Sequence, residues 1–198
     1  MKNEEIKEGV KTFVAKNAIE WRNWLEKNHK TEKSVWLIIF KKGSDIPSVT
    51  YPEAVNEALC FGWIDSKPNK RDDLSYYQFF ARRNPSSRWR GLNKRKVKEL
   101  IAQGKMTDEG YKMIRIARET GTWSALDNVE KMIVPEDLQS EFDSNMEAST
   151  NWQKFPPSSK KIILEWILSA RRPTTRQNRI KETVNLAAQN IRANHYRS

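Results

Sequence analysis

TYPEAVNEALCFGWIDSKPNKRDDLSYYQFFARR, residues 50–83, is the stretch that decides the fold of the N-terminal part of the chain. Its first residues, Thr50, Pro52 and Glu53, supply the capping hydroxyl, the early proline and the acid that favour a helix start. Gly62 predicts that this helix ends near residue 61. Two extended stretches follow, WIDSKPNK and LSYYQFFARR, and together they predict an antiparallel hairpin.

Two further elements are expected upstream of this stretch. Asn17 followed three residues later by Glu20 is typical of a capped helix start, and the apolar residues after it lie on one helical face. SVWLIIF, residues 34–40, is apolar on both faces and predicts a buried strand. The first half is therefore predicted to run α-β-α-β-β, as a small antiparallel sheet with flanking helices in an α+β fold.

The pattern becomes helical after residue 92. A helix is expected from Thr107 to Thr120, and Pro135 opens a short one. Nearer the C-terminus, Ser158 or Ser159 is expected to cap a helix that ends at Pro173. A second capping box, TTRQ at residues 174–177, is expected to open the last helix.

We expect two regions, an α+β region of residues 1–142 and a C-terminal helical region of residues 143–198. The C-terminal helices are predicted to pack on the sheet region as one unit with it. The reason is that Trp166 and the apolar stripe that includes Ile180 need more cover than two helices provide alone.

Composition narrows the class of protein. The single cysteine among 198 residues excludes an internal disulfide framework and favours a reducing compartment. The first residues mix acids and bases, unlike a signal peptide. The longest apolar run, residues 35–40, is far shorter than the ~20 residues that span a bilayer. A cytoplasmic protein without membrane insertion is expected.

Charge is uneven along the chain, whose net charge is +11. Residues 82–98 hold eight basic residues and no acid, and residues 160–181 hold seven basic residues and one acid. Residues 127–147, between these blocks, hold seven acids and one lysine. The basic blocks suit an anionic small molecule, an acidic protein surface or nucleic acid, but they also suit pairing with the acidic block.

No catalytic, metal or cofactor signature is present in the sequence. A thiol nucleophile would need a partner for Cys60, and the only histidines are His29 and His195. One cysteine and two distant histidines do not form a metal site, and the scattered glycines form no phosphate loop. Asp65 is the best acid–base candidate, although a turn-stabilising aspartate explains it equally simply.

Arginine and tryptophan together can hold an anion and stack on a flat ring. The candidate ligand-binding residues are therefore Trp63, Asp65, Ser66, Arg82, Arg83, Arg88, Trp89, Arg90 and Lys94. A second basic patch comprises Arg171, Arg172, Arg176 and Arg179, on a helix pair that superficially resembles a DNA-binding helix-turn-helix. The alternative is that the aromatic residues belong to the core and the arginines form a solvated rim.

Five strings resemble one family: EALCFGWIDS (57–66), YYQFFARR (76–83), RWRGLNK (88–94), GKMTDEGYKMI (104–114) and SKKIILEWILSARRPTTRQNRI (159–180). Together they resemble the YdeI/OmpD-associated, or bacteriocin-protection, family. The resemblance implies a phenotype, protection against bacteriocins or cationic peptides, and supplies no catalytic residue.

Three functions remain open from the sequence. The first is a non-enzymatic binding or stress-protection protein whose basic and aromatic surface, residues 82–98, engages an anionic or aromatic partner. The second is a nucleic-acid-binding protein that uses both basic blocks. The third is an enzyme that acts on a small acidic substrate near Asp65.

Overall fold

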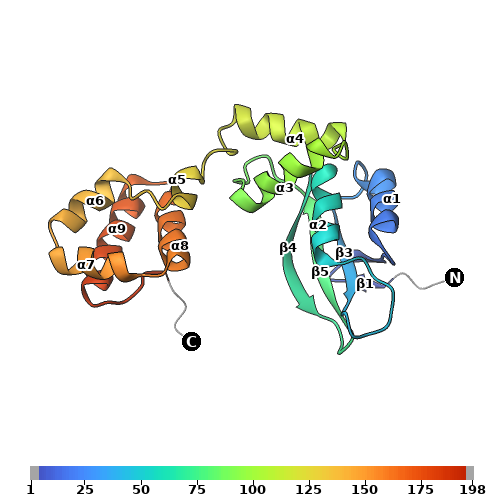
Figure 1. Ribbon diagram of the computed structural model, residues 1–198, viewed down its shortest axis with the longest axis horizontal. Coiled ribbons are helices and arrows are strands. Elements are labelled where there is room, and N and C mark those ends of the chain that lie inside the picture. The colour runs from blue at the N-terminus through green and yellow to red at the C-terminus, as the bar shows by residue number, and fades with distance from the viewer. Residues whose placement is uncertain (1–4, 195–198) are drawn as a thin grey trace. The chain divides into compact units, whose positions relative to one another are not determined.

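The computed structural model describes residues 5–194 and divides into two compact units, one that ends at Ser124 and one that begins at Ala125. The first unit has a sheet with flanking helices and the second is helical (Figure 1). The α+β class is thus confirmed. The boundary predicted after residue 142, between two regions packed as one unit, stays a prediction.

The first unit alternates strands and helices. Its strands are β1 (Ile6–Lys7), β2 (Val10–Val14), β3 (Ser34–Phe40), β4 (Trp63–Lys70) and β5 (Ser75–Arg82). Its helices are α1 (Ala18–Asn28), α2 (Tyr51–Cys60), α3 (Gly91–Ala102) and α4 (Asp108–Glu119). The predicted α-β-α-β-β order is present from α1 to β5, and β1 and β2 precede it.

The sheet has the order β1-β2-β3-β5-β4 and is mixed. Three neighbouring pairs are antiparallel, but β2 pairs parallel with β3. The purely antiparallel prediction is wrong at this pair, because α1 carries the chain back to the start of the sheet before β3 begins. β1 and β2 were not predicted, since two and five residues are too few to show a clear strand pattern.

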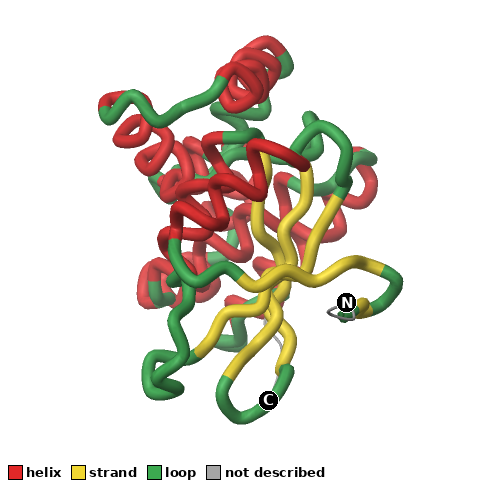
Figure 2. Tube along the Cα trace, turned by 90° about the vertical axis from the view of Figure 1, so that its right-hand side faces the viewer, coloured by secondary structure: helices red, strands yellow, loops and turns green. Residues whose placement is uncertain are grey.

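Helices α1 and α2 cover one face of the sheet, where Trp21, Leu37 and Phe80 are fully buried. The opposite face carries Trp36, which is also fully buried. Long side chains cover Trp36: Lys7 lies 5.3 Å and Lys67 5.6 Å from its ring centroid. The N-terminal segment therefore runs across this second face of the sheet (Figure 2).

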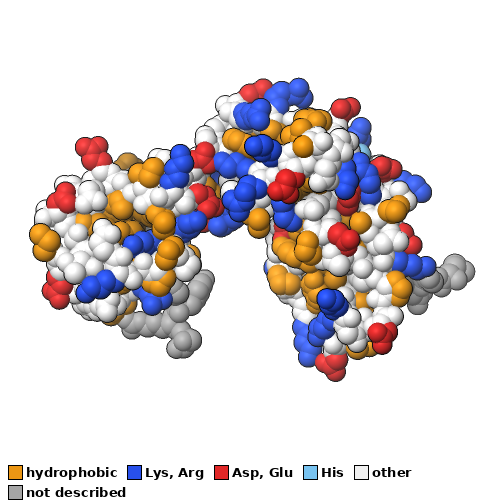
Figure 3. Space-filling view, in the orientation of Figure 1, with side chains coloured by type: hydrophobic (Ala, Val, Ile, Leu, Met, Phe, Trp, Pro, Cys, Tyr) orange, Lys and Arg blue, Asp and Glu red, His pale blue; other side chains and the backbone are white. Residues whose placement is uncertain are grey.

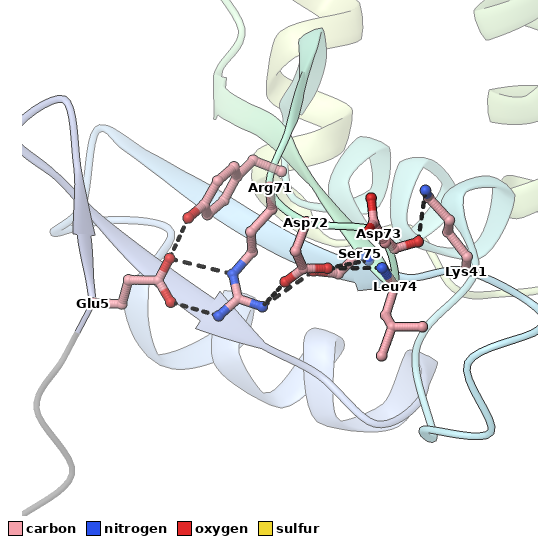
Figure 4. A network of polar contacts seen from close by, with 8 residues as sticks. Glu5, Lys41, Arg71, Asp72, Asp73, Leu74 and Ser75 are labelled. Atoms are coloured by element: carbon pink, nitrogen blue, oxygen red, sulfur yellow. Dashed lines mark hydrogen bonds and ion pairs between the residues drawn. The ribbon is translucent and has the colours of Figure 1, made fainter.

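A polar network holds that segment in place (Figure 4). The Glu5 carboxylate accepts hydrogen bonds from Arg71 Nε (3.3 Å) and Nη2 (2.9 Å), and from the Tyr77 hydroxyl. Arg71 Nη1 also donates to Asp72 Oδ2 at 2.9 Å and to Ser75 Oγ at 3.1 Å. The start of the described chain is thus tied to the β4–β5 hairpin.

The predicted helix caps of this unit are confirmed. Asn17 accepts from the Glu20 amide at 2.9 Å. Thr50 donates from its amide (2.9 Å) and its hydroxyl (2.7 Å) to Glu53 Oε2. Thr107 is the N-cap of α4, as expected.

Over residues 125–194, the second unit has helices and no strand: α5 (Asp127–Glu130), α6 (Glu136–Asp143), α7 (Met146–Lys154), α8 (Pro157–Leu168) and α9 (Pro173–Ala188). Three boundary predictions are wrong. Arg172, not Thr174, is the N-cap of α9, and no side-chain cap hydrogen bond forms there among the described residues, so the predicted TTRQ capping box is absent. Pro156, not Ser158 or Ser159, is the N-cap of α8, and Pro173 starts α9 instead of ending α8. Proline suits a first helical turn, where its missing N–H is not needed.

This unit has its own core, in which Leu138, Phe142, Ile163 and Ile180 are buried. Helices α6, α7 and α8 all contact α9, so they supply apolar cover for the Ile180 stripe. Packing of these helices on the sheet region stays a prediction. None of the helices in the described residues is long and apolar enough to cross a membrane.

Candidate functional site

A cleft of about 370 Å³ lies in the first unit, at the edge where β4 begins and β5 ends. The end of α1, the α2–β4 turn, the end of β5 and one face of α4 form its walls. We call it the α1–α4 cleft. Its lining residues are His29, Lys30, Phe61, Gly62, Trp63, Arg82, Arg83, Pro85, Glu109, Lys112, Met113 and Ile116.

Two glycines allow α4 to approach α2 closely enough to form this wall. Gly62 has a φ of +71°, and a Cβ there would lie 2.8 Å from Met113 Cγ. A Cβ on Gly110 would lie 2.4 Å from the carbonyl oxygen of Cys60. The same oxygen accepts hydrogen bonds from the Thr107 amide (3.2 Å) and hydroxyl (2.6 Å), so the contact is well anchored.

Positive charge dominates the cleft. Four cationic side chains line it, and the only acid among the lining residues is Glu109. Lys112 lies 3.5 Å from Glu109, and both side chains are partly exposed, so this ion pair is weak. The lining therefore carries an excess of three positive charges, held beside the apolar side chains of Phe61 and Met113.

Arg82 stabilises this wall of the cleft through hydrogen bonds to backbone carbonyls. Its Nε donates to the Glu32 carbonyl at 2.8 Å, and its Nη2 donates to the Lys30 carbonyl. These bonds tie the segment after α1 to the end of β5. Replacing Arg82 would therefore disturb the cleft wall as well as its charge.

Arg83 is the unusual member of the site. Its side chain is buried, with 5% of the residue exposed, and its guanidinium lies 3.8 Å from the ring centroid of Trp89. Nη2 donates to the Arg88 carbonyl at 2.9 Å, but the buried Nε has no hydrogen-bond partner in the part of the chain that the structure describes. Burial lowers the Arg83 pKa to about 10, against a smaller opposing effect of the Asp65 charge. A buried guanidinium without an ion pair is costly unless an anion comes near it.

Asp65 and Ser66 lie further along β4 and do not line the cleft. Asp65 Oδ2 accepts from the Tyr51 hydroxyl at 2.7 Å. Burial, with a further contribution from Asp65, raises the Tyr51 pKa to about 12, so this phenol stays protonated at neutral pH. Ser66 is exposed, and its carbonyl accepts from Gln78 Nε2 at 3.1 Å.

The other candidates follow β5. Trp89 is buried under Arg83, and Arg88 contributes its carbonyl to that guanidinium. Arg90 is the N-cap residue of α3. Lys94 Nζ donates to the Trp123 carbonyl at 3.2 Å. The structure thus brings Trp63, Arg82 and Arg83 together at the cleft and leaves the remaining candidates beside it or away from it.

The second basic patch lies in the other unit and is partly used within it. Arg176 forms a bidentate pair with Asp137 at 2.6 and 2.8 Å, which links α9 to α6. Arg179 donates to the Trp166 carbonyl and, at 2.8 Å, to Ser169 Oγ. Arg171 and Arg172 are exposed between α8 and α9. Half of this patch therefore stabilises the helical unit.

Among the described residues, Cys60 and His29 form no reactive pair. Cys60 is buried, and burial raises its thiol pKa to about 11, so the thiolate is scarce at neutral pH. His29 Nδ1 lies 2.8 Å from the Leu25 carbonyl, and His195 is outside the described residues. Within residues 5–194, no three His, Cys, Asp or Glu side chains gather as a metal site would need.

Sequence reasoning missed cleft residues that lie far along the chain from residues 82–98, above all Lys30 after α1 and Glu109 and Lys112 of α4. Only tertiary contacts bring them to the site, because Arg82 binds the Lys30 carbonyl and α4 packs on α2. The one available signal was GKMTDEGYKMI, residues 104–114, which contains Gly110 and Lys112.

Comparison with known proteins gives two family matches. Residues 13–113, half of the chain, match a domain of unknown function (DUF8412), and residues 131–190 match the family described as bacteriocin-protection, YdeI or OmpD-associated. The α1–α4 cleft lies within the first match. No curated protein and no solved structure gives a significant match.

The fold and the cleft define a two-unit α+β protein with a positively charged cleft in its first unit. The chain belongs to the DUF8412 family, whose model covers residues 13–113, and its C-terminal helices are similar to the YdeI/OmpD-associated, bacteriocin-protection family over residues 131–190. The resemblance seen in the sequence is thereby confirmed.

Proposed function

We propose that this protein is a non-enzymatic binding protein that takes a small anionic ligand in the α1–α4 cleft, in a bacteriocin-protection or stress role. The observation that carries the proposal is the buried Arg83. Within residues 5–194 its Nε has no hydrogen-bond partner and its side chain no ion pair, and its cleft holds three other cations and one acid. An anion in the cleft would offset the cost of burying that guanidinium.

The size of the cleft suits a small molecule. At about 370 Å³ it falls in the range of ligand pockets, and apolar side chains such as Phe61 and Met113 lie beside the cations. The role in protection rests on the family match of residues 131–190. A cationic peptide would be repelled by this cleft, so we infer that protection proceeds through an anionic ligand and not through capture of the peptide.

Calorimetric titration with inorganic phosphate and with citrate tests the proposal. We expect saturable binding of at least one of them, weakened about fivefold by Lys112→Gln, as the loss of one partly exposed charge predicts. Lys70→Gln is the matched control. Lys70 also forms a weak ion pair with an exposed acid, Asp73 at 3.6 Å, but it does not line the cleft.

Equal affinity of wild type and Lys112→Gln for both anions would contradict the proposal. The nucleic-acid alternative predicts a different pattern: a single-stranded oligonucleotide would bind, and its affinity would fall steeply with salt. The run of cations along α3, KRK at residues 94–96, is the observation that keeps this alternative in the test.

A further inference from the structure

A second hollow, of about 490 Å³, lies in the first unit and shares no lining residue with the α1–α4 cleft. One side of α3 forms its floor, and the end of α4 with the turn after it forms its wall. We call it the α3 groove. Its lining residues are Gly91, Lys94, Arg95, Val97, Lys98, Ile101, Arg118 and Trp123.

The floor of the groove is apolar. Val97 is buried, Ile101 is 36% exposed, and Trp123 is partly buried against the core of the unit. Trp123 is firmly placed, because its amide donates to the Ala117 carbonyl at 2.9 Å and its ring packs 5.0 Å from that of Trp89. The groove therefore has a preformed aromatic wall.

The rim of the groove is cationic. Arg95, Lys98 and Arg118 are exposed there, and among the described residues none of these three side chains forms an ion pair. Arg118 lies 5.4 Å from the ring centroid of Trp123. No acid lines the groove, and lysine and arginine side chains gather over α3 and α4 (Figure 3). An apolar floor with an unpaired cationic rim suits a molecule that combines an apolar body with an anionic group.

The dimensions favour a flat body over a long chain. From Lys94 to Ile101 the helix rises about 10 Å, room for a two-ring aromatic system. Trp123 is the one aromatic side chain among the described residues that line the groove, so it offers a platform for one ligand ring. A strand of nucleic acid would use several such platforms in a row.

We propose that the α3 groove binds a small aromatic anion, with its ring against Val97, Ile101 and Trp123 and its anionic group on Arg95, Lys98 and Arg118. This site goes beyond the anion cleft, because it uses other residues and selects for a ring as well as for charge. No covalent step is involved.

Naphthoate is the test ligand. Its binding is measured by calorimetry and by the shifts of the tryptophan indole N–H signals in NMR spectra of the intact protein. We expect saturable binding that shifts the Trp123 signal and that is weakened about tenfold or more in the double variant Arg95→Gln/Lys98→Gln. Both side chains are exposed, so the double variant should fold normally. Arg115→Gln, an exposed cation of α4 outside the groove, is the control.

Neutral naphthol and non-aromatic cyclohexane carboxylate should each bind at least tenfold more weakly than naphthoate, because each lacks one half of the recognised chemistry. Equal binding of naphthol, or an unchanged double variant, would overturn the proposal. So would naphthoate binding that only Lys112→Gln weakens, since the ligand would then occupy the α1–α4 cleft. Tighter binding of an oligothymidylate than of naphthoate in the groove would assign the site to nucleic acid instead. The phosphate titration with Lys112→Gln tests the α1–α4 cleft separately, so its outcome does not depend on any result for the α3 groove.

Discussion

Glu5 shows how single residues stabilise this fold. Its carboxylate accepts hydrogen bonds from Arg71 and from Tyr77, and these bonds, those from Arg71 first, hold its pKa below the ordinary value of 4.5. A carboxyl group whose pKa is lower in the folded state stabilises the fold above its unfolded pKa. That stabilisation is lost as pH falls through the folded pKa.

We therefore expect Glu5→Gln to lower the free energy of unfolding at neutral pH by about 1 kcal/mol, a modest value because the side chain is partly exposed. The difference from wild type should shrink once the pH falls below 4.5. Urea unfolding at neutral and at acidic pH measures it. Glu8→Gln, which removes only loose ion pairs at 3.5 and 3.6 Å, should change little at either pH, and an equal effect of both variants would refute the assignment.

At the cleft, the sequence did not predict which contacts each single residue makes. The run of cations around Arg82 and Arg83 was visible in the sequence, but their separate roles were not. Arg82 binds backbone carbonyls whereas Arg83 is buried on Trp89, and that distinction depends on the turn of the chain after β5. Spacing along a strand gives the face of a side chain and not the partners that it meets.

Among the elements, the α2–α4 contact carries the most consequence, because it builds one wall of the cleft. Gly110 lies in this contact, where the α2 backbone comes so close that there is no room for a side chain. Alanine favours a helix more than glycine does by about 1 kcal/mol, so propensity alone predicts that Gly110→Ala stabilises α4.

We expect the opposite result, a loss of about 3 kcal/mol, because a Cβ would meet the Cys60 carbonyl at 2.4 Å and Met106 Sδ at 2.3 Å. Chemical denaturation gives the free energy of unfolding. Gly43→Ala is the control: a Cβ at Gly43 meets nothing within 4 Å, so its effect should stay within about 0.5 kcal/mol. A stabilised Gly110→Ala variant would show that α4 shifts easily and that the wall is not rigid.

Most elements of the sheet unit after residue 17 could be predicted, because local signals and tertiary structure agree there. Thr50 with Glu53 and the apolar run of residues 34–40 are examples. The N-terminal strands could not be predicted, since β1 is two residues long and is stabilised by the distant Arg71 and Tyr77. Ser158 and Ser159 were mistaken for the cap of α8, although they lie in its first turn, because the prolines just before them already supply the helix start.

At the scale of the whole molecule, each unit has a core of its own. Helices α5 and α6 precede the boundary predicted from sequence at residue 142, yet Leu138 and Phe142 of α6 are buried in the core of the second unit. The Asp137–Arg176 pair also joins α6 to α9.

We therefore expect the fragment of residues 125–198 to fold and to unfold cooperatively in a circular dichroism melt. The fragment of residues 143–198 lacks α5 and α6, so it should melt without a cooperative transition. Limited proteolysis of the intact chain should likewise spare residues 146–154, which form α7. A cooperative melt of the shorter fragment, or its release by protease, would place the boundary where the sequence first suggested it.

The buried Arg83 also bears on how long the protein survives in a cell. Under the proposed function, a bound anion would pair with this cation, which forms no ion pair among the described residues, so the protein with its anion would lie further from unfolding than the protein without it. Proteases degrade the transiently opened fraction, which a bound anion would reduce. The amount of protein present would then follow the supply of its ligand without any change in synthesis.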